Sequence, residues 1–224
     1  MGELEAVATG EREDIYRFLS GLYLRPPSDA LIGMILDGSL TAVFREDEEM
    51  SAFVKAASGI TNLKDELEAE HASLFVLPSG VIPHEAVYLD KEKRLGGRVT
   101  MGVRQFYERA GTDLSEECIE MPDHIGMELE FVALLCKLER ELREGTDPSS
   151  LQKCIELQKT FLEEHLSRWG YLCCEEVIKH AAYGFYKAVA RFTIEFLKSE
   201  EEYVSGLYEK ACGEGEQLCG TAKN

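Results

Sequence analysis

The sequence predicts an all-α fold, a single bundle-like domain of about nine helices with a long irregular loop near residues 77–99. Three observations predict this class. Apolar residues recur with helical spacing through most of the chain, no segment alternates convincingly at period two, and no stretch repeats at a fixed period. The chain has 224 residues, of which 45% are hydrophobic, so one sizeable core is available.

The first third of the chain is expected to form four helices separated by turn signals. The first ends at the proline pair 26–27, and its apolar face consists of Ile15, Phe18, Leu19 and Leu22. Ser28 is placed to cap a short second helix, and residues 46–57 form a weak third. Asn62 is placed to cap the fourth, whose apolar stripe consists of Leu63, Leu67, His71 and Leu74.

The loop at residues 77–99 is rich in Gly, Pro and Val, and a loop of this length inside a compact domain is usually functional or a hinge. A short helix is expected to follow at residues 100–110. Pro122 then suits the first position of a long helix, because proline has no N–H group to leave unpaired there. Asp123 would place an anionic acceptor in the first turn of that helix, where free N–H groups favour it.

The remaining sequence predicts three more helices. One begins at Asp147–Pro148 and runs to about residue 168, and two others cover roughly residues 173–198 and 200–212. We therefore expect one all-helical domain at residues 1–212. Residues 213–224 are polar and rich in Gly, which predicts a disordered tail.

The charge of the chain is strongly acidic, with 24 basic and 42 acidic side chains giving −18. Such a field repels nucleic acid phosphates and anionic lipid surfaces and attracts basic peptides, although acidity also serves solubility alone. We expect no nucleic acid partner. We expect a monomer or a homodimer, since the residues favour neither state.

Several features predict a cytoplasmic protein. No apolar run approaches the ~20 residues that span a bilayer, so stable membrane insertion is not expected. Residues 1–14 are acidic and lack the apolar segment of a secretory signal. The seven cysteines are odd in number and contain no C-x-x-C spacing, which is typical of buried thiols in a reducing compartment.

The sequence lacks the constellations that most enzymes require. It has no phosphate-binding glycine motif, no G-x-S-x-G elbow and no H-E-x-x-H. Glu68 and His71 form one E-x-x-H, whereas a di-iron bundle needs two. His124 and Glu128 lie one helical turn apart, so a small helical metal-dependent enzyme that uses these two residues is the alternative. We expect no catalytic residues, no metal site and no cofactor.

Binding features are better supported. Leu74–Phe75 and Val87–Tyr88 bracket the long loop, and Asp123 and His124 follow it. Together these side chains would line an apolar groove with acidic edges, which suits an amphipathic or extended peptide that carries arginines. The alternative is that each apolar pair only packs the loop onto the bundle.

An ordered series of motifs extends from about residue 12 to residue 198. It includes E-H-A-S-L-F at 70–75, P-H-E-A-V-Y at 83–88, P-D-H-I at 122–125 and E-L-E-F at 128–131. Further matches follow at Gln158, Phe161, Leu162, His165, Leu166 and Trp169. This series resembles the TorD/DmsD family of redox-enzyme maturation chaperones.

The resemblance implies an all-helical cytoplasmic chaperone without catalysis. Its partner would be a molybdopterin oxidoreductase of the DMSO or TMAO reductase type. The chaperone would bind the twin-arginine leader and the apo form of that enzyme and assist cofactor insertion before export. Some relatives serve clients without an export signal, such as nitrate reductase subunits, and this alternative stays open.

The resemblance and the groove hypothesis together give a set of candidate peptide- or client-binding residues: Leu74, Phe75, Pro83, His84, Tyr88, Pro122, Asp123 and His124. Asp123 would pair with a leader arginine. If His124 contacts the client, affinity should vary between about pH 5.5 and 8. Two departures are notable: His84 replaces an aromatic residue common in relatives, and Ala86 replaces a frequent serine.

Overall fold

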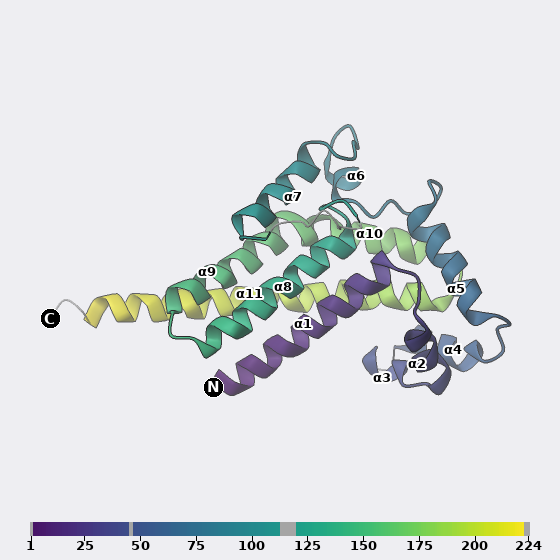
Figure 1. The fold of residues 1–224 in the computed structure, drawn as a ribbon, viewed down its shortest axis with the longest axis horizontal. Coiled ribbons are helices and arrows are strands. Elements are labelled where there is room, and N and C mark those ends of the chain that lie inside the picture. The colour runs from purple at the N-terminus through teal and green to yellow at the C-terminus, as the bar shows by residue number, and fades with distance from the viewer. Residues whose placement is uncertain (1, 45–46, 113–119, 222–224) are drawn as a thin grey trace.

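The computed structural model, shown in Figure 1, describes residues 2–44, 47–112 and 120–221. Over these residues the chain forms eleven α-helices and two single-turn π-helical segments, η1 and η2. Within the same residues the only extended pairing is one isolated antiparallel bridge, His84 with His124. The predicted all-α class is therefore confirmed.

The first half of the fold matches the expected helices with one addition. Its elements are α1 (Gly2–Leu24), α2 (Asp29–Asp37), α3 (Leu40–Val43), α4 (Glu48–Ala57), α5 (Leu63–His71) and η1 (Ala72–Val76). The Ser28 hydroxyl accepts the N–H of Leu31, so the expected cap of α2 is confirmed. Asn62 instead adopts a left-handed conformation, with φ of 55°, and its side chain makes no capping bond.

The second half differs more from expectation. Its elements are α6 (Glu85–Leu89), α7 (Arg98–Arg109), α8 (Ile125–Glu144), α9 (Pro148–Phe161), η2 (Leu162–Leu166), α10 (Ser167–His180) and α11 (Gly184–Thr221). The loop at residues 77–99 is thus interrupted by the one-turn helix α6. The backbone of α11 continues to Thr221 where a tail was expected from residue 213, and residues 222–224 lie outside the described residues.

The sequence predicted helix boundaries near residues 170 and 199. The structure instead places the boundary between α10 and α11 at residues 181–183. Its cause is distant in sequence. The Glu70 carboxylate accepts the backbone N–H groups of Ala182 and Tyr183, both at 2.7 Å. A carboxylate from α5 therefore stabilises the start of α11, because it satisfies donors that have no partner within the helix.

The helix predicted to open at Pro122 begins three residues later, so that expectation was wrong. α8 starts at Ile125, and His124 Nδ1 caps it by accepting the N–H of Gly126 at 3.0 Å. The Asp123 side chain does not cap α8, because its carboxylate is held by α6 and α7. The proline and the acid thus predicted the approximate start of α8 correctly, but not the groups that the Asp123 carboxylate binds.

The helices pack around one core, with α1 lying along α8 and α11 running the length of the molecule (Figure 1). Gly126 permits this close approach, since a Cβ atom there would lie 2.5 Å from Leu24 Cγ. A buried polar cluster joins the same helices: the Arg12 guanidinium donates to Glu139, Glu200 and Gln158 at 2.8–3.1 Å. The helices α2 to α5 lie at one end, and α6 and α7 form an apex.

Two further features concern cysteines and membranes. Cys173 and Cys174, the vicinal pair in α10, are both fully buried free thiols, and the Cys174 sulfur lies 3.3 Å from the Tyr23 hydroxyl. Across the described part of the chain, none of the helices combines the length and the apolar character that a bilayer crossing requires.

Candidate functional site

Residues 83–86 and 123–125 form the structural centre of the candidate site. The N–H of Glu85 donates to the Asp123 carbonyl at 2.8 Å, and the N–H of Ile125 donates to the Pro83 carbonyl at 2.9 Å. These bonds fix the loop before α6 to the residue that precedes α8. Two motifs that lie 37 residues apart in the sequence are thus one structural unit.

Asp123 is the residue that holds this unit together. Its side chain is fully buried, and its Oδ2 accepts the N–H of Ala86 at 3.2 Å and the hydroxyl of Thr100 at 3.0 Å. His84 Nδ1 lies 3.5 Å from Oδ1. Burial alone would raise the pKa of Asp123, but these hydrogen bonds outweigh it and lower the pKa, so the carboxylate stays ionised. It therefore clamps the first turns of α6 and α7.

His124 lies beside this clamp and is only 3% exposed. Its ring meets that of His84 edge to face, with 5.1 Å between centroids. Burial, followed by the neighbouring His84, lowers the pKa of His124 to about 3. The ring is therefore neutral near pH 7, which agrees with Nδ1 accepting a hydrogen bond at the start of α8.

A second buried polar chain lies behind α6. Glu85, only 2% exposed, contacts His165 Nδ1 at 3.0 Å, and Trp169 Nε1 donates to Glu128 at 3.0 Å. Burial and the adjacent Glu85 carboxylate raise the pKa of Glu128 well above its usual range. The neutral form of Glu128 is therefore favoured beside the Glu85 carboxylate. This chain ties α6 and α8 to η2 and α10.

The clamp supports one wall of a surface groove of about 480 Å³. One wall is formed by residues 80–82, by Val87 and Tyr88 of α6 and by Lys93. The opposite side comes from α10, through Leu172, Glu175–Glu176, Lys179 and His180. Tyr88 rests on the indole of Trp169, with 5.4 Å between ring centroids.

The groove has exposed apolar side chains and charges of both signs, with Glu176 paired to Lys179 at 2.8 Å. Ile82 is 39% exposed and Leu172 is 47% exposed, which is high for aliphatic side chains of a soluble domain. Val76 and Leu77, at 68% and 51%, lie in the preceding turn, whose Leu74 carbonyl accepts the N–H of Val81. The groove can therefore take an apolar segment of a peptide, with Glu175 at its edge.

The structure separates the eight predicted binding residues into three groups. Tyr88 lines the groove. Leu74 is 2% exposed, and Phe75 is half-buried between the rings of Tyr23, His71 and Tyr186, so both belong to the core. The others form or adjoin the unit behind the groove: Pro83, His84, Pro122, Asp123 and His124. Asp123 presents no exposed carboxylate to a leader arginine in this structure.

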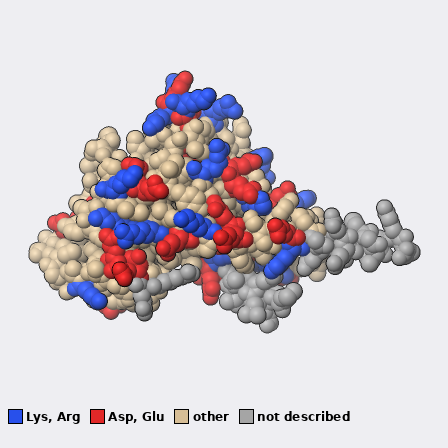
Figure 2. All heavy atoms as spheres, turned by 180° about the vertical axis from the view of Figure 1, so that it is seen from behind, with Lys and Arg blue, Asp and Glu red and all other residues tan. Residues whose placement is uncertain are grey.

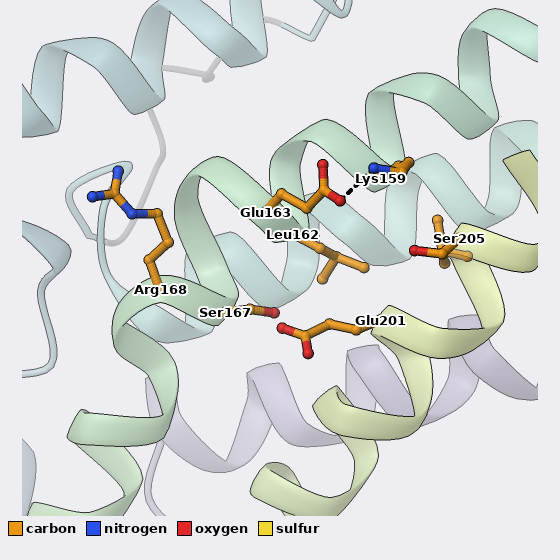
Figure 3. A pocket seen from close by; sticks show the side chains of 8 residues that line it. Lys159, Leu162, Glu163, Ser167, Arg168, Glu201 and Ser205 are labelled. Carbon is orange, nitrogen blue, oxygen red and sulfur yellow. Dashed lines mark hydrogen bonds and ion pairs between the residues drawn. The ribbon is translucent and has the colours of Figure 1, made fainter.

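Two other hollows contain none of the predicted residues. A cavity of about 360 Å³ lies between α10 and α11, where the Glu201 carboxylate points toward Ser167 and Arg168 points away (Figure 3). A wider cleft lies beside α6 and η2. Among the residues that the structure describes, no three His, Cys, Asp or Glu side chains are grouped as metal ligands, so His124 and Glu128 gain no third partner.

The sequence did not single out the groove residues on α10 or the buried pair of Glu85 and His165. Leu172 directly precedes the buried cysteines 173 and 174, so a fully apolar run concealed its exposure. Glu85 and Glu128 gave a weak signal, because each has an apolar residue directly after it, and Glu128 also one directly before it.

Comparison with known proteins places the chain in a family. Residues 44–175 match the family model described as nitrate reductase delta subunit. Over 94% of this chain and 99% of the relative, the sequence is 25% identical to the chaperone protein TorD of Vibrio cholerae serotype O1. It is 24% identical to the TorD chaperone of Vibrio vulnificus, covering 88% of this chain and 95% of that protein.

A third relative carries a different name. The probable Tat proofreading chaperone DmsD of Haemophilus influenzae is 28% identical over 81% of this chain and 86% of its own length. These relatives are chaperones and not enzymes. Together, the matching family model and the near full-length similarity show that the chain belongs to the TorD/DmsD family of redox-enzyme maturation chaperones.

Proposed function

We propose that this chaperone binds the twin-arginine leader of a molybdopterin oxidoreductase precursor in the groove between residues 80–88 and α10. The groove itself is the observation that carries the proposal. Its exposed Ile82 and Leu172 can receive the apolar part of a leader, and Glu175 lies beside them for an arginine.

The buried residues behind the groove do not need to contact the leader themselves. Asp123 acts by holding α6 in place, since its Oδ2 accepts the N–H of Ala86 and the hydroxyl of Thr100, and His124 acts by capping α8 through Nδ1. We propose that they position the groove wall and do not touch the leader. Tyr88 is the one predicted residue to which we assign direct contact.

The names of the relatives support the biological setting. A relative named as a Tat proofreading chaperone fits a client that is exported with a twin-arginine leader. Under this proposal the protein works in the cytoplasm, holds the apoenzyme of the DMSO or TMAO reductase type, and releases it after cofactor insertion.

The family description favours a second candidate client. The matching model is described as nitrate reductase delta subunit, which fits a nitrate-reductase-type enzyme that is not exported. The two clients differ in whether a cleavable leader is recognised. Binding of a free leader peptide supports the first candidate, and binding only to the apoenzyme supports the second.

Isothermal titration with a twin-arginine leader from a molybdopterin oxidoreductase of the same genome tests the proposal. Leu172→Glu should weaken binding at least about tenfold, because it places a charge where an apolar segment docks. Leu36→Glu is the matched control, since Leu36 is 55% exposed on α2 and lies outside the groove. Absence of binding by the unmodified protein, or equal weakening by both variants, would contradict the proposal.

A further inference from the structure

The cavity of about 360 Å³ between α10 and α11 shares no lining residue with the groove. The end of α9, η2 and the first turn of α10 form one side, and α11 forms the other. Its volume lies at the lower end of the range of small-ligand sites. The cavity is therefore a separate candidate for binding.

The wall of this cavity contains a break in helical regularity. η2 is a π-helical turn, in which the N–H of Ser167 donates to the carbonyl of Leu162, five residues earlier. Both residues line the cavity. Turns of this kind are rare and are frequent at functional sites.

Ser167 has a buried hydroxyl without a hydrogen-bond partner among the described residues. The residue is 7% exposed, and the Glu201 carboxylate points toward it from α11 (Figure 3). A buried hydroxyl that lacks a partner is unfavourable, because it has lost its hydrogen bonds to water. A ligand in the cavity that reaches Ser167 would remove this cost.

Glu201 is a carboxylate that pairs with no cation of the described residues. The two cations of the cavity wall are engaged elsewhere. Lys159 forms an ion pair with Glu163. Arg168 points away from the cavity and donates to the Glu164 carbonyl at 3.4 Å. The position of the charges, and not their sum, therefore leaves Glu201 open to a cationic ligand.

Local groups decide what this cavity can bind. On the face of the molecule that Figure 2 shows, acidic and basic side chains are interspersed and not gathered by sign. The Tyr171 hydroxyl lies close to Glu201, because burial and then this carboxylate raise the pKa of Tyr171. A neutral hydroxyl does not cancel the charge, and a carboxylate offers about four acceptor positions. Glu201 can therefore still accept hydrogen bonds from a ligand.

The lining as a whole matches a primary alkylammonium group. Such a group has three N–H donors. The Glu201 carboxylate and the hydroxyls of Ser167 and Ser205, which is one turn beyond Glu201 on α11, can accept them. Leu162 and Val204 offer apolar contact to the attached methylene groups.

We infer that this cavity binds an organic primary amine, either the side chain of a partner's lysine or a free aliphatic amine. The inference goes beyond the proposed leader site and does not depend on it. A chain that binds no leader could still bind an amine here, and the converse holds.

NMR titration of the full chain with butylammonium chloride tests this inference. The methyl signals of Leu162 and Val204 should shift with the amine, but not with butanol or sodium chloride at the same concentration. Glu201→Gln should weaken binding at least about tenfold, because the charged acceptor is lost. Glu202→Gln should leave binding unchanged and is the matched control, since this neighbour is exposed and does not line the cavity.

Ser167→Ala separates a binding role from a structural one. It should weaken amine binding about threefold, because one hydrogen bond is lost. The urea midpoint of the free protein should stay the same or rise, because the removed hydroxyl has no partner there. A lower midpoint together with unchanged amine binding would assign Ser167 to the fold and contradict the inference.

Two further probes distinguish the sources of the amine. Tighter binding of a lysine amide with an acetylated α-amino group supports a partner's lysine, and tighter binding of diaminobutane supports a free amine. No shift with any amine, an equal response to butanol, or equal weakening by the Glu201 and Glu202 variants would overturn the inference.

Discussion

His124 shows how burial changes the role of a histidine. Its Nδ1 is fixed as the cap of α8, and its pKa of about 3 keeps the ring neutral from pH 5.5 to pH 8. Protonation of His124 should therefore not change leader affinity between pH 5.5 and pH 8. The sequence had suggested such a change if His124 contacts the client. The charge state matters instead for the stability of the fold.

The pH dependence of stability gives a first prediction. Below pH 6.5 the unfolded chain binds a proton at His124 that the folded chain does not bind, so stability falls as the pH falls. From pH 7 to pH 5 this group should cost about 2 kcal/mol. His124→Asn keeps a capping acceptor but removes the titration, so urea unfolding should show less loss between these pH values. An identical loss in both proteins would contradict this assignment.

Residue identities predicted the site in part. A proline, an acid and a histidine before an apolar helix correctly indicated a specialised helix start. The hydrogen-bond partners of Asp123 could not be predicted from the sequence. Ala86 and Thr100 are distant in sequence, and the packing of their helices brings them to Asp123. Local patterns report which atoms need partners, and tertiary structure decides which partners they find.

At the scale of elements, the turn between η1 and α6 depends on Gly80. A Cβ atom at this position would lie 2.2 Å from the Ser73 carbonyl oxygen and 2.5 Å from that of Leu74, both backbone atoms. The loop that forms the groove wall therefore lies directly against η1. Only glycine allows this approach without displacement of the backbone.

Gly80→Ala should destabilise the protein by on the order of 1–3 kcal/mol, because the clash involves backbone that cannot rotate away. It should also weaken leader binding, since residues 81 and 82 line the groove. Gly33→Ala is the control, because nothing lies within 4 Å of the added atom in α2 and alanine favours a helix. Thermal unfolding and leader titration of both variants check the prediction, and equal behaviour would refute it.

The Arg12 cluster joins α1 to α8, α9 and α11 and gives another prediction. Arg12→Met should destabilise the fold by about 3–5 kcal/mol, because Glu200 is left buried without its cation and Glu139 keeps only Arg143. Arg17→Met on the same helix should cost less than about 1 kcal/mol, since Arg17 is 38% exposed in its ion pairs. Chemical denaturation separates the two, and a small effect of Arg12→Met would show that the cluster is not stabilising.

Element types were more predictable than element ends. Helical spacing correctly indicated α1, α2, α5 and α8, whose apolar stripes face the core. The separation of α10 from α11 was missed, because a carboxylate from α5 supplies the cap and leaves no local signal. The helix α6 was missed because one turn is too short to show a period.

At the scale of the whole molecule, the net charge of −18 should accelerate the association of a basic leader. The association rate should fall steeply as salt rises, whereas the dissociation rate should change little, because long-range attraction acts before contact. Stopped-flow mixing with a labelled leader at several salt concentrations measures both rates. An association rate that is independent of salt would show that the net charge does not accelerate leader binding.

The central claim is that a leader lies in the groove between residues 80–88 and α10. Hydrogen exchange of the full chain, with and without a saturating twin-arginine leader, tests it most directly. The account predicts slower exchange at residues 80–88 and in α10, with α1 and α8 unchanged. Protection confined to other elements, or no protection with a leader shown to bind, would contradict the account.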